Sequence, residues 1–557
     1  MCIKTTKYFF ISIVLVILSN YVLLAQTDTT TQNIKKPKAE PMDLPNAIIY
    51  GEAYLNVGSS VKQNPTSIPK LEGKELDSLN SLEKQNSLLL PPVGLSKDIY
   101  SRYKNKGFLD FSFGSFITPE IIGAYEIKAG DYNLFFNGGY NYSSGHTDEA
   151  NFSKLFLDIK SDYIAPNKYW LFGGSKTRTN LFFKSDSYNN YAGFENTVNN
   201  PDFIVENRTR TQLGFKLDVD GNYEGFDFSS GAGFNLAGIK GDSTDLSEQG
   251  VNGYLKITNP LNDYRMGLNV NLNLNNVNNI STNFIQANLF GGYNIDVFDI
   301  IFEGGIQLAK GTISDSRFGL LLGGRTNIRL NENVTLFGGV ESGLENNNFT
   351  SLMILNPYLS NNAMFDYRYN IVKINSGIWL HFDKDFGIKS KVSYSITENL
   401  PVFVNDFQNT YNTLNNSFNI SYENASILNI NVDTYYNFTE NDNLGIIVDL
   451  NFTKLDTVGQ NIPYFSPLNL MISYKRNWND SFSSNVNFNH LGSRTTNLTN
   501  NVTVESFNAL NLFLEYKLQK NLMFNLKLNN ILNSKIYIWN NYIERGLFAS
   551  LGINWQF

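Results

Sequence analysis

Cysteine is almost missing from this chain, since Cys2 is the only one among 557 residues. We expect the segment that carries Cys2 to be removed, which would leave no thiol in the mature protein. Disulfide bonds, thiol redox chemistry and thiolate metal sites are therefore excluded. Histidine occurs only three times, and no spacing of His, Asp and Glu suggests a metal ligand set. The sequence predicts neither a metal nor a cofactor.

Charge and long apolar runs are also scarce. Charged residues make up 17% of the chain, the net charge is −7, and no block of one sign occurs. Nucleic-acid binding needs a concentrated basic surface, so we expect no nucleic-acid partner. No run of about 18 apolar residues follows residue 24, which excludes helical membrane spans. The composition still allows a membrane β-barrel. The lumen-facing residues of such a barrel keep the mean hydropathy low, and here it is −0.24.

The N-terminus has the pattern of a signal peptide over residues 1–25. Lys4 and Lys7 precede an apolar stretch over residues 8–24, and the chain turns polar after Ala25. An uncleaved anchor helix is the alternative, because the apolar stretch is long and Leu23 is large for its position. The polar tract over residues 27–38 favours cleavage after Ala25 and export of the chain.

Residues 26–106 differ in composition from everything that follows. They hold seven of the 15 prolines, at positions Pro37, Pro41, Pro45, Pro65, Pro69, Pro91 and Pro92. We interpret this part as a mostly irregular periplasmic or lumenal segment. A short strand is expected at Ala47, Ile48, Ile49 and Tyr50, and a short helix over residues 74–85.

Residues 107–557 alternate between apolar and polar side chains, strand after strand. A strand points successive side chains to opposite faces, so each segment has one apolar face and one polar face. In the last strand the apolar row is Leu547, Leu551, Ile553, Trp555 and Phe557, and the polar row is Ser550, Asn554 and Gln556. Asparagine dominates the polar rows, and the candidate lumen-lining residues are Asn269, Asn271, Asn429, Asn431 and Asn487.

The connections between these strands alternate between short polar turns and longer loops. This alternation is typical of outer-membrane β-barrels, and the segmentation gives about 22 strands over residues 107–557. We expect the sheet to close into a barrel, because an open sheet edge in lipid would leave backbone N–H and C=O groups unpaired. A soluble sandwich is the alternative. Aromatic pairs at strand ends, such as Trp539 with Tyr542, favour the barrel because aromatic girdles lie at membrane interfaces.

One loop combines residue types found in hydrolases. Ser144, His146 and Asp148 lie within five consecutive positions. A catalytic triad needs its three groups oriented in space, which neighbours on one loop rarely achieve. We therefore interpret them as a polar surface loop and predict that the protein is not an enzyme.

The C-terminal region resembles the end of TonB-dependent outer-membrane receptors. The resemblance rests on Asn529-Asn530-Ile531-Leu532-Asn533, Tyr537, Trp539, Tyr542, Arg545-Gly546 and the closing strand. It implies a 22-stranded barrel and a C-terminal signal, Leu551, Ile553, Trp555 and Phe557, that the barrel-assembly machinery reads. Ala47 to Tyr50 resemble the strand that such receptors offer to TonB. The family's plug domain is longer than residues 26–106, so we expect it to be absent or strongly reduced.

These observations predict a barrel in the outer membrane of a Gram-negative cell that binds or transports a solute. The loops at residues 346–370 and 399–416 are the expected capture surface. The alternative is a barrel that transports nothing and serves as a scaffold or binds a partner protein. The expected partners are outer-membrane lipids, the barrel-assembly machinery, and TonB or another periplasmic or surface protein.

Overall fold

The computed structural model describes residues 106–167, 173–192, 205–261, 263–295, 297–382, 385–405, 417–456, 460–499 and 502–557. All of them belong to one compact unit. The predictions for the signal peptide, for the segment over residues 26–105 and for the strand from Ala47 to Tyr50 lie outside the described residues. Engagement of TonB by that strand stays a prediction.

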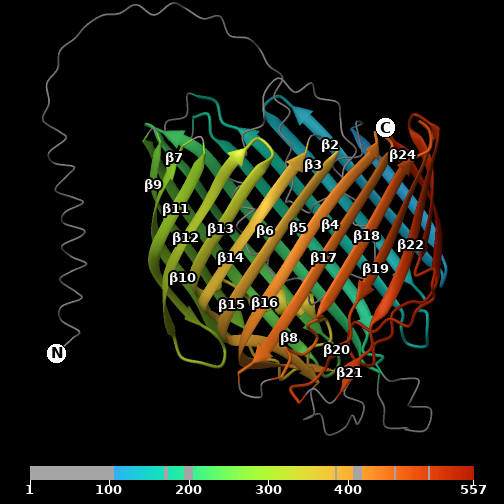
Figure 1. The fold of residues 1–557 in the computed structure, drawn as a ribbon. Coiled ribbons are helices and arrows are strands. Elements are labelled where there is room, and N and C mark those ends of the chain that lie inside the picture. Colours follow the sequence, from blue (N-terminus) through green and yellow to red (C-terminus); the bar gives the residue numbers. More distant parts are fainter. Residues whose placement is uncertain are drawn as a thin grey trace, which may run out of the picture. The chain divides into compact units, whose positions relative to one another are not determined.

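Twenty-two strands form one closed antiparallel sheet (Figure 1). The strands of the barrel are β1 (Gly107–Gly114), β2 (Thr118–Ala129), β3 (Tyr132–Ser143), β4 (Phe152–Ile164), β5 (Lys176–Asn189), β6 (Asn207–Tyr223), β7 (Phe226–Lys240), β8 (Asp245–Leu261), β9 (Tyr264–Val277), β10 (Ile280–Asn294), β11 (Phe298–Lys310), β12 (Arg317–Asn331), β13 (Val334–Leu344), β14 (Tyr369–Phe382), β15 (Phe386–Asn405), β16 (Phe418–Thr439), β17 (Asp442–Leu455), β18 (Leu468–Asn477), β19 (Phe482–Leu491), β22 (Phe507–Gln519), β23 (Leu522–Asn529) and β24 (Phe548–Gln556). The predicted all-β barrel of 22 strands is confirmed.

Closure depends on the pairing of the first strand with the last. β1 pairs with β24 from Phe108 opposite Gln556 to Gly114 opposite Ser550, so every barrel strand has two neighbours. The described chain also contains a two-stranded sheet of β20 (Arg494–Thr495) and β21 (Thr503–Val504), and the helix α3 (Phe349–Leu355). No helix among the described residues is long and apolar enough to cross a membrane.

The two ends of the barrel differ in their connections. At one end, the turn rim, most strands are joined by tight turns, as at Gly130, whose φ of 61° suits a residue without a Cβ. Phe557 lies on this rim and exchanges backbone hydrogen bonds of 2.9 and 3.0 Å with Gly107. The opposite end, the loop rim, carries the longer connections at residues 144–151, 190–206, 345–368, 456–467 and 530–547.

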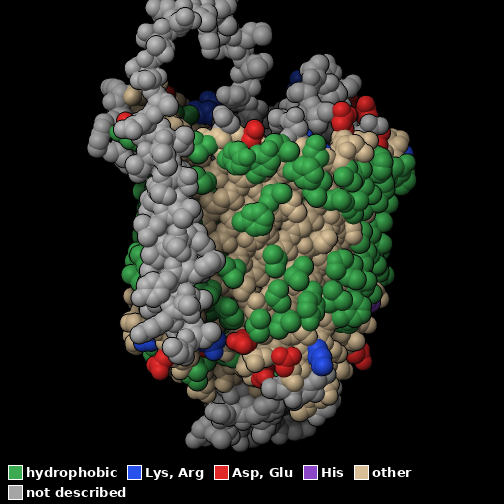
Figure 2. All heavy atoms as spheres, turned by 60° about the vertical axis from the view of Figure 1, so that its left-hand side comes forward, with side chains coloured by type: hydrophobic (Ala, Val, Ile, Leu, Met, Phe, Trp, Pro, Cys, Tyr) green, Lys and Arg blue, Asp and Glu red, His purple; other side chains and the backbone are tan. Residues whose placement is uncertain are grey.

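The outer face of the barrel is apolar and the inner face is polar. On β9, Leu272 and Leu274 are exposed on the outside, while Asn269 and Asn271 alternate with them on the inside. Exposed large side chains of this kind cover the outer surface, and in the view of Figure 2 the charged side chains lie near the two ends. In β24 the exposed residues are Leu551, Ile553 and Trp555, and the buried polar residues are Ser550, Asn554 and Gln556; Phe557, directly after the strand, is also exposed.

Several strands reach further toward the loop rim than the sequence pattern indicated. β15 continues to Asn405, through part of the loop expected at residues 399–416, and β8 begins as early as Asp245. These extensions carry inward-facing residues such as Leu246 and Phe403, which are buried against loops that fold into the barrel. Packing, rather than alternation alone, sets these strand ends. β5 starts at Lys176, two residues after Gly174, whose φ of 75° suits a residue without a Cβ.

Candidate functional site

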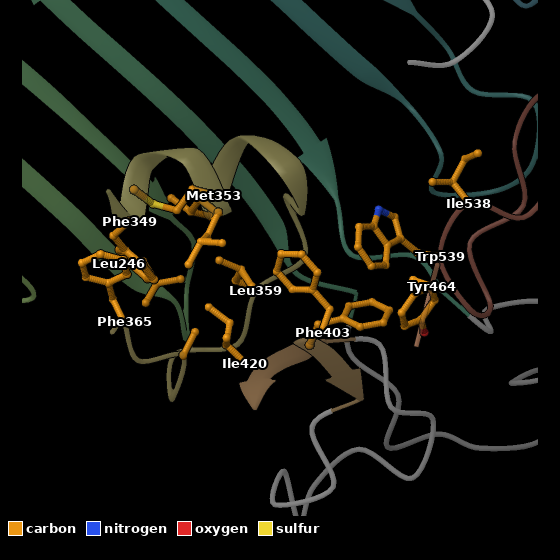
Figure 3. Packing of buried hydrophobic residues seen from close by; sticks show 14 of the residues in the cluster. Leu246, Phe349, Met353, Leu359, Phe365, Phe403, Ile420, Tyr464, Ile538 and Trp539 are labelled. Atoms are coloured by element: carbon orange, nitrogen blue, oxygen red, sulfur yellow. The ribbon is translucent and has the colours of Figure 1, made fainter. Parts of the chain in front are cut away.

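Three connections at the loop rim pack against inner-face residues at the ends of the barrel strands. We call residues 345–368, 460–467 and 530–547 the cap. The main buried apolar cluster of the protein consists of cap residues and of inner-face residues at the strand ends beneath them (Figure 3). Its members are Ala192, Ile239, Leu246, Val277, Phe284, Ala309, Leu344, Phe349, Leu352, Met353, Leu359, Ala363, Phe365, Tyr367, Phe403, Phe418, Ile420, Tyr464, Leu491, Phe507, Ala509, Ile536, Ile538, Trp539 and Tyr542.

The helix α3 holds the first cap connection against the barrel wall. Asn348 caps the helix, and its side-chain oxygen accepts a hydrogen bond of 3.1 Å from the backbone N–H of Ser351. Glu248, on the inner face of β8, is 1% exposed and accepts hydrogen bonds from the backbone N–H and the hydroxyl of Thr350. A carboxylate at this end of a helix is favourable because the unpaired N–H groups there carry partial positive charge. Glu248 therefore fixes the helix to β8.

Trp539 joins the cap connections to one another. Its ring centroid lies 4.8 Å from that of Tyr464, 5.1 Å from Phe418 and 5.3 Å from Phe403 (Figure 3). These partners come from a second cap connection and from the ends of two barrel strands. Such aromatic pairs add stability beyond their burial. Trp539 is 4% exposed, so the prediction that it belongs to an interfacial girdle is wrong.

A stack of tyrosines continues this packing toward β5. Tyr358 and Tyr542 stack with centroids 3.5 Å apart, and Tyr191 meets Tyr542 edge to face at 5.3 Å. Tyr542 is 1% exposed and is likewise not interfacial. Burial raises the pKa of Tyr358 and of Tyr542 well above 10, so the stack stays uncharged. The stack closes the gap between two cap connections with apolar surface.

Two buried arginines bind the cap backbone, Arg208 from the barrel strand β6 and Arg494 from β20 of the two-stranded sheet. Arg208 donates 2.7 Å to the carbonyl of Leu359 and pairs with Glu206 at 2.8 Å. Arg494 donates 3.3 Å to the carbonyl of Ile538, and burial lowers its pKa to about 10, which leaves it protonated at neutral pH. Removing one member of a buried pair leaves the other charge without compensation. The cap is therefore held by polar anchors as well as by apolar packing.

Glu206 should make part of this anchoring depend on pH. Burial raises the pKa of this carboxyl, but Arg208 and hydrogen bonds from Ser243 outweigh burial, and its pKa is lowered from 4.5. A depressed folded pKa stabilises the fold above the unfolded value, and this stabilisation is lost as pH falls through the folded pKa. We expect the protection factor of the Ser243 amide against hydrogen exchange, whose N–H is 2.7 Å from Glu206, to fall below about pH 4.5.

The Glu206→Gln variant is the control for this experiment. A neutral amide should give the same protection factor at Ser243 at every pH, without the loss in acid. Acid-dependent exchange of equal size in both proteins would show that another group is responsible.

The predicted lumen-lining asparagines lie on the inner face. Asn269 donates 3.2 Å to Asn288, Asn429 donates 2.8 Å to Asn451, and Asn431 donates 2.6 Å to Asp449. Asn271 and Asn487 lie on the same inner face, opposite Gln286 and Asn511 of the neighbouring strands. These amides form hydrogen-bonded rows along the wall. Their role in contacting a solute stays a prediction.

A second part of the inner wall is charged, and the sequence reading missed it. Inner-face residues of β4, β5 and β6 alternate in sign, and neighbours form ion pairs, as between Lys160 and Asp158 at 3.3 Å and between Arg210 and Asp186. The signal was present, because charges recur at every second position in β4 at Asp158, Lys160 and Asp162. Thus one sector of the lumen is charged while others are rich in asparagine.

His146 has a packing role in the structure. Its ring lies 6.3 Å from Phe116 and 6.2 Å from Tyr191, and Nε2 is 2.8 Å from the carbonyl oxygen of Ile543 in the cap. The residue thus joins the connection at 144–151 to the cap. Among the described residues, no group of three or more His, Cys, Asp or Glu is arranged to hold a metal ion.

Solved structures with the same barrel identify the fold. No protein-family model matches the chain, and no curated protein matches it. The chain is similar to the FrpB iron transporter from Neisseria meningitidis (F3-3 variant), with a TM-score of 0.63 and 11% identity over 82% of each chain. It is also similar to the siderophore receptor PirA from Acinetobacter baumannii, with a TM-score of 0.62 and 10% identity over 81% of this chain and 80% of that one. The copper transporter OprC gives a TM-score of 0.62 and 11% identity over 81% and 80% of the two chains. The described part of this protein therefore has the 22-stranded barrel fold of TonB-dependent outer-membrane receptors.

Proposed function

We propose that this protein is a transport barrel of the Gram-negative outer membrane, in which a solute passes through the lumen and the cap closes the outward mouth. The apolar outer face suits lipid, and the polar inner face suits a solute path. The single observation that carries the proposal is the cap itself. A scaffold barrel has no need of an inward-folded, tightly packed closure at one end of a polar lumen.

The similar structures support the same direction. They include proteins described as an iron transporter, a copper transporter and a siderophore receptor. The solutes of these proteins do not identify the solute of this one, because the loops that contact a solute vary among proteins of one fold. The partners that belong to this proposal are outer-membrane lipids, the barrel-assembly machinery and TonB, which would bind at residues 47–50.

Removal of one cap connection should open the barrel. Leu344 and Tyr369 are paired across β13 and β14, so an Asn-Gly turn can replace residues 345–368 without moving the strands. We expect this variant to give stable single-channel currents in planar bilayers, because it loses α3 and part of the buried cluster. The wild-type protein should give none. The currents of the loop-replacement variant and of the wild-type protein are also measured in chains that lack residues 26–105.

An equal replacement of residues 144–151 is the control. Their ends, Ser143 and Phe152, are paired in the same way. This connection contributes no residue to the main buried cluster, and its recorded contact with the cap is that of His146 with Ile543. It should leave the barrel closed. Absence of current after cap removal, in both the full-length and the shortened chain, would refute the transport function and favour a partner-binding barrel.

A further inference from the structure

Residues 346–356, which we call the α3 segment, are attached to the barrel differently from the rest of the cap. Among the described residues, no backbone hydrogen bond joins this segment to the barrel. Later in the same connection, the backbone N–H of Ser360 donates 2.7 Å to the carbonyl of Phe418. In another cap connection, the backbone N–H of Ile531 donates 2.8 Å to the carbonyl of Leu510 on β22. The α3 segment is held to the wall by side chains instead.

Two side chains of opposite charge hold α3 at its two ends. Glu248 of β8 accepts hydrogen bonds from the backbone N–H and the hydroxyl of Thr350 in the first turn. Arg210 of β6 donates 3.2 Å to the carbonyl of Met353 and 3.3 Å to that of Ile354 in the last turn. These signs suit the partial charges of a helix, which are positive at its N-terminus and negative at its C-terminus. We call Glu248 and Arg210 the latch.

The chain on both sides of the α3 segment is fixed by other bonds. Before the segment, the backbone N–H of Glu345 donates 3.1 Å to the carbonyl of Arg368, and the two side chains form an ion pair. After the segment, the carbonyl of Tyr358 accepts a hydrogen bond of 2.9 Å from the backbone N–H of Phe418. The α3 segment can therefore leave the wall while its flanking residues keep their places.

A cavity of about 110 Å³ separates part of α3 from the barrel wall. Its lining includes Lys184, Arg210 and Gln212 of the wall and Thr350, Met353 and Ile354 of α3. Side chains that border a cavity lack the dispersion contacts that a filled space would supply. The apolar face of α3, with Phe349 and Leu352, is buried in the main cluster, so the segment is closed in this structure. Its closure depends on that face and on the latch, and the cavity weakens its packing against the wall.

We propose that the α3 segment is the part of the cap that opens during transport, and that Glu248 and Arg210 keep it closed. The inference rests on the transport function proposed above and names the moving part of the closure. Residues 357–368 and the two other cap connections stay in place while the segment opens. A solute that enters the cavity contacts Arg210 and Thr350, so it competes for the hydrogen bonds that hold α3 against the wall.

Cysteine labelling of the full chain in detergent tests this proposal. Leu352 in the α3 segment and Leu359 in the fixed part of the same connection are both buried, and Figure 3 shows Leu359. Each leucine is replaced by cysteine in a separate variant, and Cys2→Ser removes the only native thiol. A water-soluble maleimide dye reacts with a thiol only when the thiol is accessible, so the labelling rate measures opening at each position.

We expect Glu248→Met and Arg210→Met each to increase the labelling rate of Leu352→Cys on the order of tenfold or more, since each removes a charge-assisted hydrogen bond. Leu359→Cys should stay protected in both backgrounds. Arg208→Met is the matched control, because Arg208 lies on the same face of β6 as Arg210 but donates to the carbonyl of Leu359. It should leave the labelling of Leu352→Cys unchanged, and circular dichroism verifies that every variant is folded.

Three results would overturn the proposal. An equal increase at Leu352→Cys and Leu359→Cys would mean that the whole connection opens as one piece. An unchanged rate at Leu352→Cys in both Glu248→Met and Arg210→Met would mean that these two side chains do not keep α3 closed. An equal increase in Arg208→Met would mean that any lost anchor loosens the cap.

This proposal and the transport function fail in different ways. Current after cap removal, without faster labelling in Glu248→Met and Arg210→Met, would refute only the role of the α3 segment. Faster labelling of Leu352→Cys, without current after cap removal, would refute only the transport function and leave α3 as a latched segment of a closed barrel.

Discussion

Replacing Leu272 by lysine is expected to destabilise the barrel by about 2–4 kcal/mol, the cost of a cation on the lipid face near the membrane centre. Leu272 lies in the second half of β9, is 37% exposed, and is paired with Ile285 on the apolar outer face. A lysine there must either lose hydration or distort the lipid around it. Unfolding by guanidinium in phospholipid vesicles, followed by tryptophan fluorescence, measures the change.

Asn271→Lys is the control on the same strand. Asn271 is adjacent to Leu272 but faces the lumen opposite Gln286, where water can hydrate an ammonium group. We expect a change within about 0.5 kcal/mol, as for an ordinary surface substitution. If both variants lose the same stability, the inside and outside assigned from alternation are wrong. If only Asn271→Lys is destabilised, the two faces are reversed.

Alternation predicted the barrel well because each strand meets two different solvents. From Ser550 to Phe557, residues of the apolar row alternate with residues of the other row. The apolar row is exposed on the outside of the barrel, and Ser550, Asn554 and Gln556 are buried on the inside. The predicted start of the barrel at residue 107 also agrees with the first strand, which begins at Gly107. Local sequence is sufficient here, because lipid on one side and water on the other impose period two on every strand.

The cap could not be predicted in the same way, because its contacts join residues far apart in the chain. Trp539 and Tyr542 have the composition of an interfacial girdle, and only their contacts with Phe418 and Tyr358 reveal burial. One local signal was available: Asn348 is a good helix cap. After it, Phe349, Leu352 and Met353 follow helical spacing, which predicts a short buried helix.

Charge pairing on the inner wall shows the same limit. Sequence places Lys154 and Lys184 on inner faces by alternation, but charge pairing depends on register between strands. Lys160 and Lys154 both lie on the inner face of β4, yet only Lys160 has a carboxylate within ion-pair distance. The difference arises because Asp186, opposite Lys154, is taken by Arg210 of the next strand. Which charged side chains form ion pairs can be predicted only once the register between the strands is known.

Replacing Trp539 by alanine is expected to release the cap while the barrel stays folded. The indole contacts Tyr464, Phe418 and Phe403, and removing a buried tryptophan from such packing costs about 3–5 kcal/mol. This loss acts on the cap, because the barrel strands keep their backbone pairing. Hydrogen exchange should accelerate in residues 460–467 and 530–547, and planar bilayers should record currents that the wild-type protein lacks.

Trp478→Ala separates this effect from the general loss of an aromatic side chain. Trp478 is 56% exposed in the turn between β18 and β19, at the turn rim. Arg476 lies 4.4 Å from its ring, and its indole N–H donates a hydrogen bond of 2.9 Å to Ser484. Exchange in the cap and the absence of current should be unaffected by this change. Unchanged exchange in both cap segments of Trp539→Ala would mean that the aromatic cluster does not hold the mouth closed. Faster exchange without current would mean that another part of the chain blocks the lumen, because a released cap leaves a polar path along the asparagine rows.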